Sequence, residues 1–440
     1  MGNTCRRSNY VDEFTKASQA DELARLQAFA REGVAFDTAV ALRSAAWAGH
    51  LAVAQYLVEE CGVDVNASSD GGDTALMMAA SNGMIEVIRY LVNQCHGDVN
   101  ATNQDGDTAL MKAVYNSKIE VVRYLAKECG VDVNTTSDDG ETALMKATEY
   151  DRLEILRYLA AECGADVNVA SKNGTTALIK ASGYGRIQVV QYLAEECGAD
   201  VNAQAKNGET AVMKAAAFGQ IDVIRYLVEK CGVDVNARGH GGYTALLLAA
   251  RYGNIEVVSY LAEKCRADVN VESDYEATAL MKAAESGRIR VVQYLIEQLG
   301  VDVNATTKDG YTALIKATEY GQTEIIRYLV EKCGADVHAK TTKGDTALRV
   351  AADRGFQDIQ RILMPFVQLR PQANTLAAPA ENTTISSIAP FIRPNEIEFT
   401  SFSRKGNIGG DFHAKWLDAN VVVKLFIPDA SRSVFDDEVR

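Results

Sequence analysis

Cysteine is the residue type in this 440-residue chain with the widest chemistry, because a thiol can form a disulfide, bind zinc or act as a nucleophile. Equivalent positions of stacked helical units lie about 8–10 Å apart, whereas a disulfide needs Cα atoms within about 7 Å. No C-x-x-C pair is present, and the five histidines are scattered singly. We therefore expect reduced structural thiols, with no metal site and no catalytic residue. Eight of the nine cysteines recur at one spacing, with Leu299 in the gap: Cys61, Cys95, Cys129, Cys163, Cys197, Cys231, Cys265 and Cys333.

Lysines and aromatic residues form a second series, which suits binding better than catalysis. Aromatic residues stand four positions after lysines, and residues four apart share one face of a helix, so they predict a cationic and aromatic stripe. Aromatic anchors in a charged surround are typical of interface hot spots, and lysines favour an acidic partner. Alternatively, the rings only cover neighbouring helices while the lysines offset the chain's negative charge. The series comprises Lys112, Lys146, Tyr150, Lys180, Tyr184, Lys214, Phe218, Tyr252, Lys282, Lys316 and Tyr320.

Copies of one 34-residue unit must position both series. Tyrosine recurs nine times at this period, from Tyr56 to Tyr328. A fixed period of this size is typical of a stack of small units rather than a globular enzyme core. In one copy Thr210 can cap a first helix, Gly219 ends it, and a second helix begins at Ile221. The tyrosines are predicted to pack in the core, and pairs such as Glu86–Arg89 to lie on a solvated outer face.

The unit closely resembles the ankyrin repeat over residues 12–364. The family's Thr-Pro-Leu-His-x-Ala-Ala has its counterpart in Thr-Ala-Leu-Met-Lys-Ala-Val at 108–114, and Gly-Ala-Asp-Val-Asn stands intact at 164–168 and 198–202. Alanine replaces the proline of the Thr-Pro step, and the unit is one residue longer than the usual length of about 33. The resemblance implies an all-α solenoid of about ten repeats whose concave groove binds protein partners along the lysine and aromatic stripe.

The sequence also predicts how the repeat array begins and ends and where single copies depart from the pattern. Residues 12–36 predict an N-terminal cap of two helices, and Pro365 is expected to stop the last helix. Glu276 replaces a turn glycine, while Ser117 and Asp151 replace helix-ending glycines. A side chain in a left-handed backbone is costly, so these three positions are predicted to be weak joints.

Charge and the N-terminus limit the partners and the compartment. The net charge of −14 argues against nucleic acid as the main partner. No secretory signal and no membrane span is visible, so we expect a cytoplasmic monomer, with the nucleus as the alternative compartment. Gly2 and Cys5 suggest dual acylation, but Arg6 stands where myristoylation favours Ser or Thr, which argues against lipid anchoring. Residues 1–11 are expected to be disordered.

The composition changes after the repeats. Five of the six prolines lie between 365 and 394, which predicts a linker over residues 365–396. Residues 397–440 then suggest three short strands and the start of a helix, in the order that opens a protein kinase domain of the tyrosine-kinase-like group. By this resemblance Gly406 and Gly409 belong to the phosphate-covering loop, Lys424 contacts nucleotide phosphates and Glu438 pairs with it. Arg404 and Asp411 depart from the family pattern.

This β fragment resembles only the first part of a kinase N-lobe. The catalytic base and magnesium ligands of a kinase come from segments further along such a domain, so no phosphate transfer and no cofactor is expected from this chain. ATP and Mg²⁺ would enter only if a complete kinase domain follows. We therefore expect a protein-binding scaffold with a truncated kinase domain. The alternative is a protein kinase whose C-terminal part lies beyond this sequence, with the repeats recruiting a substrate or regulator.

Overall fold

The computed structural model describes residues 15–32, 37–368, 397–404, 410–416 and 419–425. The chain divides into two compact units, residues 1–370 and 371–440. The predicted linker from residue 369 onward, the N-terminal segment with Gly2 and Cys5, and the predicted loop and helix residues Gly406, Gly409 and Glu438 lie outside the described residues.

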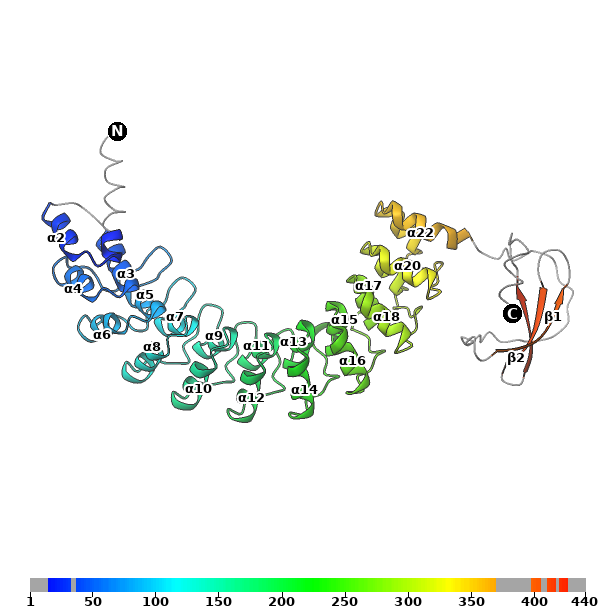
Figure 1. The fold of residues 1–440 in the computed structure, drawn as a ribbon, viewed down its shortest axis with the longest axis horizontal. Helices are drawn as coiled ribbons and strands as arrows, with labels where there is room; N and C mark the ends of the chain where they lie inside the picture. The colour runs from blue at the N-terminus through cyan, green and yellow to red at the C-terminus, as the bar shows by residue number, and fades with distance from the viewer. Residues whose placement is uncertain (1–14, 33–36, 369–396, 405–409, 417–418, 426–440) are drawn as a thin grey trace, which may run out of the picture. The chain divides into compact units, whose positions relative to one another are not determined.

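The described part of the first unit contains helical residues 15–19 and α2 (Leu23–Arg31), both within the predicted cap, followed by ten helix pairs stacked in chain order (Figure 1). The inner helices are α3 (Thr38–Ala48), α5 (Ala75–Asn82), α7 (Ala109–Tyr115), α9 (Ala143–Glu149), α11 (Ala177–Gly183), α13 (Ala211–Phe218), α15 (Ala245–Tyr252), α17 (Ala279–Glu285), α19 (Ala313–Glu319) and α21 (Ala347–Asp353). The outer helices are α4 (Leu51–Glu59), α6 (Ile85–Asn93), α8 (Ile119–Arg123) with the π-helical turn η1 (Tyr124–Glu128), α10 (Leu153–Glu162), α12 (Ile187–Glu195), α14 (Ile221–Glu229), α16 (Ile255–Glu263), α18 (Ile289–Glu297), α20 (Thr323–Glu331) and α22 (Gln357–Gln368).

Each inner helix from α5 onward begins at the same cap. A threonine directly before the helix accepts a hydrogen bond from the backbone N–H three residues later, at 3.2–3.4 Å. This satisfies one of the donors that a helix start leaves without a partner. Gly219 ends α13 with φ +74°, as its position predicts. Local sequence thus sets both ends of the helix.

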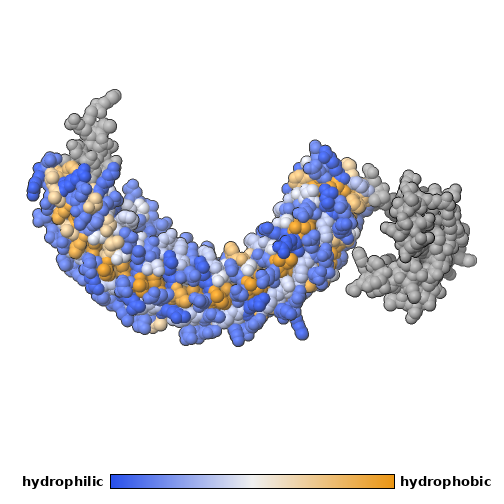
Figure 2. Space-filling view, in the orientation of Figure 1, coloured by the Kyte–Doolittle hydropathy of each residue, from blue (hydrophilic) through white to orange (hydrophobic). Residues whose placement is uncertain are grey.

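One apolar core runs through all the repeats. Small and branched side chains such as Ala113, Val122 and Leu159 are fully buried. Alanines let the two helices of a pair approach closely, and valine and leucine fill the space between pairs. Partly buried residues extend this core to the surface. Figure 2 shows apolar side chains gathered in a band that follows the repeats. Among the described helices none is both long and apolar enough to cross a membrane.

Two further series of residues at equivalent positions connect neighbouring repeats by hydrogen bonds. The tyrosines of the outer helices are buried or half-buried, as predicted, and several donate their hydroxyl to a glutamate of the preceding repeat. Tyr226 reaches Glu195 Oε1 at 2.9 Å, and Tyr328 reaches Glu297 Oε1 at 2.7 Å. In the loops, asparagine side chains accept from the backbone N–H of an aspartate in the next repeat, at 2.8–3.3 Å.

Two expectations about local structure meet different outcomes. Ser117, Asp151 and Glu276 have φ of +61°, +58° and +57°, so these side chains do occupy left-handed backbone as predicted. The expectation that Pro365 stops the last helix is wrong, because α22 continues through it to Gln368. Phe366 and Val367 pack against the core, and this packing offsets the hydrogen bond that proline cannot donate.

The second unit contains a three-stranded sheet of β1 (Ile397–Arg404), β2 (Gly410–Trp416) and β3 (Ala419–Leu425). Each strand pairs antiparallel with the next in chain order. The β1–β2 register shifts between Phe399 and Ser401, and Asp411 of β2 lies opposite Lys424 of β3. The described part of this unit thus follows the predicted order of three short strands.

Candidate partner-binding face

The exposed side of the inner helices, called the inner face below, carries the lysine and aromatic series. Each lysine lies four residues after the capping threonine, so the cap fixes its direction from the helix and all six point to the same side. Figure 2 shows this side of the repeats hollowed. The lysine side chains are only 11% exposed at Lys282 and 34% exposed at Lys214, so the aliphatic parts are packed rather than extended into solvent.

In the repeats of α7, α9 and α11 the lysines form an alternating chain with carboxylates. Lys146 Nζ lies 3.2 Å from Glu141 and 3.6 Å from Asp107, and Lys180 Nζ lies 2.6 Å from Glu149 while also contacting Glu141. Lys112 pairs with Asp73 at 3.4 Å and Asp107 at 3.8 Å. The positive charge expected from the sequence is therefore neutralised within the chain over these repeats.

These ion pairs shift the ionisation of the groups that form them. Burial opposes the charge on Glu141, but Lys180 and Lys146 outweigh it and lower the pKa of that carboxyl. Burial likewise opposes the charge on Lys146, and Asp107 and Glu141 reverse the effect, so that its pKa is raised. Both groups are held in their charged forms.

Further along the inner face the lysines pack on aromatic rings as well as carboxylates. Lys214 Nζ lies 3.3 Å from Glu209 and 5.6 Å from the centroid of Phe218. Lys316 lies 3.9 Å from the centroid of Tyr311, and Lys282 lies 5.5 Å from that of Tyr243. These are cation–π distances. Burial opposes the charge on Lys282, but its hydrogen bond with Tyr243 and the charge of Glu285 raise its pKa.

The aromatic residues lie at the C-terminal ends of the inner helices. Tyr184, Phe218, Tyr252 and Tyr320 are 46–60% exposed, which is unusual for rings of this size. Tyr150 is half-buried and packs edge-on against Tyr115, with centroids 4.3 Å apart. Among the expected lysine–aromatic pairs in the described residues, ring contact occurs between Lys214 and Phe218.

The sequence prediction missed other aromatic residues and all the carboxylates of this face. Tyr115 and Trp47, which are 47% and 46% exposed, stand one position before the predicted aromatic column. Tyr243 and Tyr311 stand directly before the capping threonine, in the column that holds Asp107 and Glu141 in other repeats. That column could have been recognised from the period, because Asp107, Glu141 and Glu209 each stand five positions before a lysine of the series.

The remaining candidate residues are the repeated cysteines and the predicted nucleotide-binding residues. The cysteines from Cys61 to Cys333 are free and half-buried, and burial raises the pKa of thiols such as Cys129. Lys424 stands in β3, while the other predicted nucleotide-binding residues lie outside the described part.

A family model of ankyrin repeats matches the chain in overlapping stretches, at residues 42–137, 76–171, 127–205, 163–239, 198–273, 231–307 and 280–378. The chain belongs to the ankyrin-repeat family. The matches stop at residue 378, and no family match supports the kinase resemblance of residues 397–440. A search of curated proteins finds no match. Membership of the ankyrin-repeat family supports a protein–protein interaction scaffold.

Proposed function

We propose that this ankyrin-repeat protein binds a protein partner along the inner face, with the exposed aromatic row as the main contact. The main observation is the row of Tyr184, Phe218, Tyr252 and Tyr320, whose rings are about half exposed. A partner that covers these large rings removes much apolar surface from water. Contact with Lys214 restricts the Phe218 ring, and the hydroxyl of Tyr184 donates to Glu149, so less side-chain freedom of these two rings is lost on binding.

The proposed partner presents acidic side chains near the middle of the array. Lys214 is the most exposed of the six lysines and has one carboxylate neighbour, Glu209. It is therefore the lysine best placed to meet a carboxylate from outside. Lys180, in contrast, already contacts two carboxylates and is 13% exposed, so it acts in the scaffold rather than as a partner contact.

The test is affinity capture with the complete chain, comparing wild type with a variant that carries Phe218→Ala and Tyr252→Ala. The matched control is Tyr275→Ala, which removes a ring that is 73% exposed but lies at a loop tip. We expect recovery of a specific partner to fall by about tenfold or more in the Phe218→Ala, Tyr252→Ala variant, as it does on hot-spot truncation. The control should retain the partner. Equal recovery by all three proteins, with unchanged helicity, would exclude this face as the binding site.

A second candidate function concerns the tail. We propose that residues 397–440 begin a protein kinase domain in a longer form of the protein, with the repeats recruiting a substrate or regulator. The antiparallel order β1–β2–β3, with Lys424 in β3, favours this proposal. Sequencing the transcript beyond the codon for Arg440 tests it directly. A downstream His-Arg-Asp segment and an Asp-Phe-Gly segment are expected, and an in-frame stop at that point in every transcript would contradict the proposal.

A further inference from the structure

The hairpin-like loops of successive repeats are joined by a ladder of backbone hydrogen bonds. A residue near each loop tip donates its N–H to a carbonyl 33 residues earlier, and the distances are 2.8–3.0 Å. The bonds are Gln104 to Gly71, Asp138 to Asp105, Lys172 to Asp139, Lys206 to Asn173, His240 to Asn207, Asp274 to Gly241 and Thr342 to Asp309. The position between the last two would join Lys308 to Tyr275.

At that position the described residues show a different bond. The N–H of Lys308 donates to Oε2 of the Glu276 side chain, and the Lys308 ammonium contacts the other carboxylate oxygen. Glu276 is the residue that replaces the loop glycine, and its φ is +57°. A side chain has taken the place of a backbone carbonyl in the ladder.

The neighbouring glycines explain why the backbone bond is missing. A Cβ added to Gly140, Gly174, Gly208 or Gly242 would lie 2.5–2.8 Å from the backbone nitrogen of the next loop. That is closer than a carbon atom can approach, so in these repeats glycine is what lets the loops meet. Glu276 does carry a Cβ. The next loop must therefore stand away, and the longer carboxylate spans the gap.

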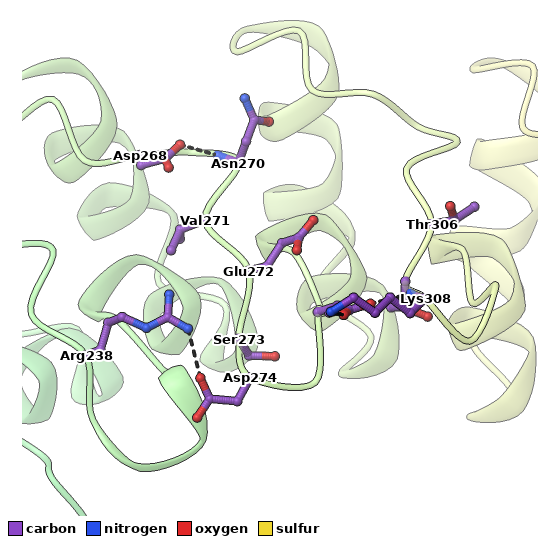
Figure 3. Close-up of a pocket in the computed structure, with 11 residues that line it drawn as sticks. Arg238, Asp268, Asn270, Val271, Glu272, Ser273, Asp274, Thr306 and Lys308 are labelled. Atoms are coloured by element: carbon purple, nitrogen blue, oxygen red, sulfur yellow. Dashed lines mark hydrogen bonds and ion pairs between the residues drawn. The ribbon is translucent and has the colours of Figure 1, made fainter.

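A cleft of about 740 Å³ lies at this joint, lined by Arg238, Asp268, residues 270–274, Glu276 and residues 306–308 (Figure 3). Figure 3 shows Arg238 reaching Asp274 on one side, while Lys308 lies beyond Glu272 on the other. The Arg238–Asp274 ion pair, at 2.9 Å, strengthens the preceding joint, where the backbone bond is intact. The loop layer is therefore continuous up to Asp274 and interrupted after it.

From these observations we propose that Glu276 makes this joint a hinge. It divides the array between the α17–α18 repeat and the α19–α20 repeat, into a block that ends at residue 305 and a block that begins at residue 307, and the two blocks open separately. Repeats are coupled only through contacts with their neighbours. A weakened joint therefore lowers the cooperativity between the repeats before it and the repeats after it. The Glu276–Lys308 contact acts as a clip that limits the opening.

Two substitutions separate the effect of the Glu276 Cβ, which keeps the loops apart, from that of the Glu276–Lys308 contact. Glu276→Gly removes both the Cβ and the carboxylate, so the loops can close and Lys308 N–H can bond to Tyr275. Glu276→Ala keeps the Cβ and removes only the carboxylate. Hydrogen exchange of the Lys308 amide, measured in the complete chain, should slow by about tenfold in Glu276→Gly and quicken by a similar factor in Glu276→Ala. The amides of Asp274 and Thr342 serve as internal references.

The reciprocal variant is Gly174→Ala, which places a Cβ 2.5 Å from the nitrogen of Lys206 and should quicken exchange there. In a urea series, protection in wild type should be lost at different concentrations for residues 37–305 and 307–368, and Glu276→Gly should bring the two concentrations together. Faster exchange at Lys308 in Glu276→Gly, or simultaneous loss of protection by both blocks in wild type, would overturn the hinge. Neither measurement involves a partner, so the result is independent of the proposed binding function.

Discussion

Replacing Lys180 by methionine tests whether the ion pairs of the inner face stabilise the fold. The substitution keeps the length and packing of the side chain but removes the ammonium that contacts Glu141 and Glu149. Breaking a fully buried pair costs about 3–5 kcal/mol, whereas exposed pairs contribute about 0–1 kcal/mol. The three side chains are 13%, 17% and 25% exposed, and Glu141 keeps Lys146 as a second partner. We therefore expect a loss of about 2 kcal/mol in the free energy of unfolding.

The matched control is Lys214→Met. Its side chain is 34% exposed and has one carboxylate neighbour at 3.3 Å, so a loss of about 0.5 kcal/mol is expected. The assay is urea unfolding of the complete chain followed by far-ultraviolet circular dichroism, with the midpoint compared at unchanged slope. Combining Lys180→Met with Glu149→Gln should cost less than the sum of the single changes by about 1 kcal/mol. A Lys180→Met protein that is no less stable than Lys214→Met, or additive losses in the double variant, would contradict this expectation.

Three further predictions concern the outer helices and the turns. Tyr226→Phe should lose about 1 kcal/mol, because its hydroxyl donates to Glu195, whereas Tyr158→Phe should be near neutral, because that buried hydroxyl has no hydrogen-bond partner among the described residues. Urea midpoints of the two variants check this, and equal losses would contradict it. Ser117→Gly and Asp151→Gly should each raise the free energy of unfolding by up to about 1 kcal/mol, since both backbones are left-handed, and a fall in thermal midpoint for both would contradict this. Burial, together with the bond to Glu195, raises the pKa of Tyr226 above 10.0, so its neutral form contributes stability that is complete below pH 10 and is lost as the pH rises through the raised value; alkaline titration of wild type and Tyr226→Phe should show a smaller loss in the variant.

Much of the fold was predictable because its causes are local. Thr210 as a cap and Gly219 as a left-handed helix end follow from backbone preferences that act within a few residues. The error at Pro365 has the opposite origin. Proline disfavours a continuing helix locally, but packing of Phe366 and Val367 against the core decides the outcome.

The partners of charged residues were not predictable in the same way. Glu86 and Arg89 are correctly spaced for a pair on one helix, yet Arg89 lies 3.3 Å from Glu128 of the next repeat and stacks 4.5 Å from the ring of Tyr124. The candidate face shows the same limit. The sequence predicted the position of Lys146 on the inner face, but not its pairing with Asp107 and Glu141.

The residues alone specify that similar helix pairs follow one another, where most of the helices begin and end, and which repeated positions are apolar, because short-range backbone preferences and a 34-residue period are present in the sequence. Which side chains of neighbouring repeats meet depends on the folded structure. The stagger between repeats places Tyr226 beside a residue 31 positions earlier and Arg89 beside one 39 positions later, and this stagger depends on how the helix pairs pack. The same reason applies at Glu276: the sequence marks a missing glycine, and the closeness of the next loop decides what its Cβ displaces.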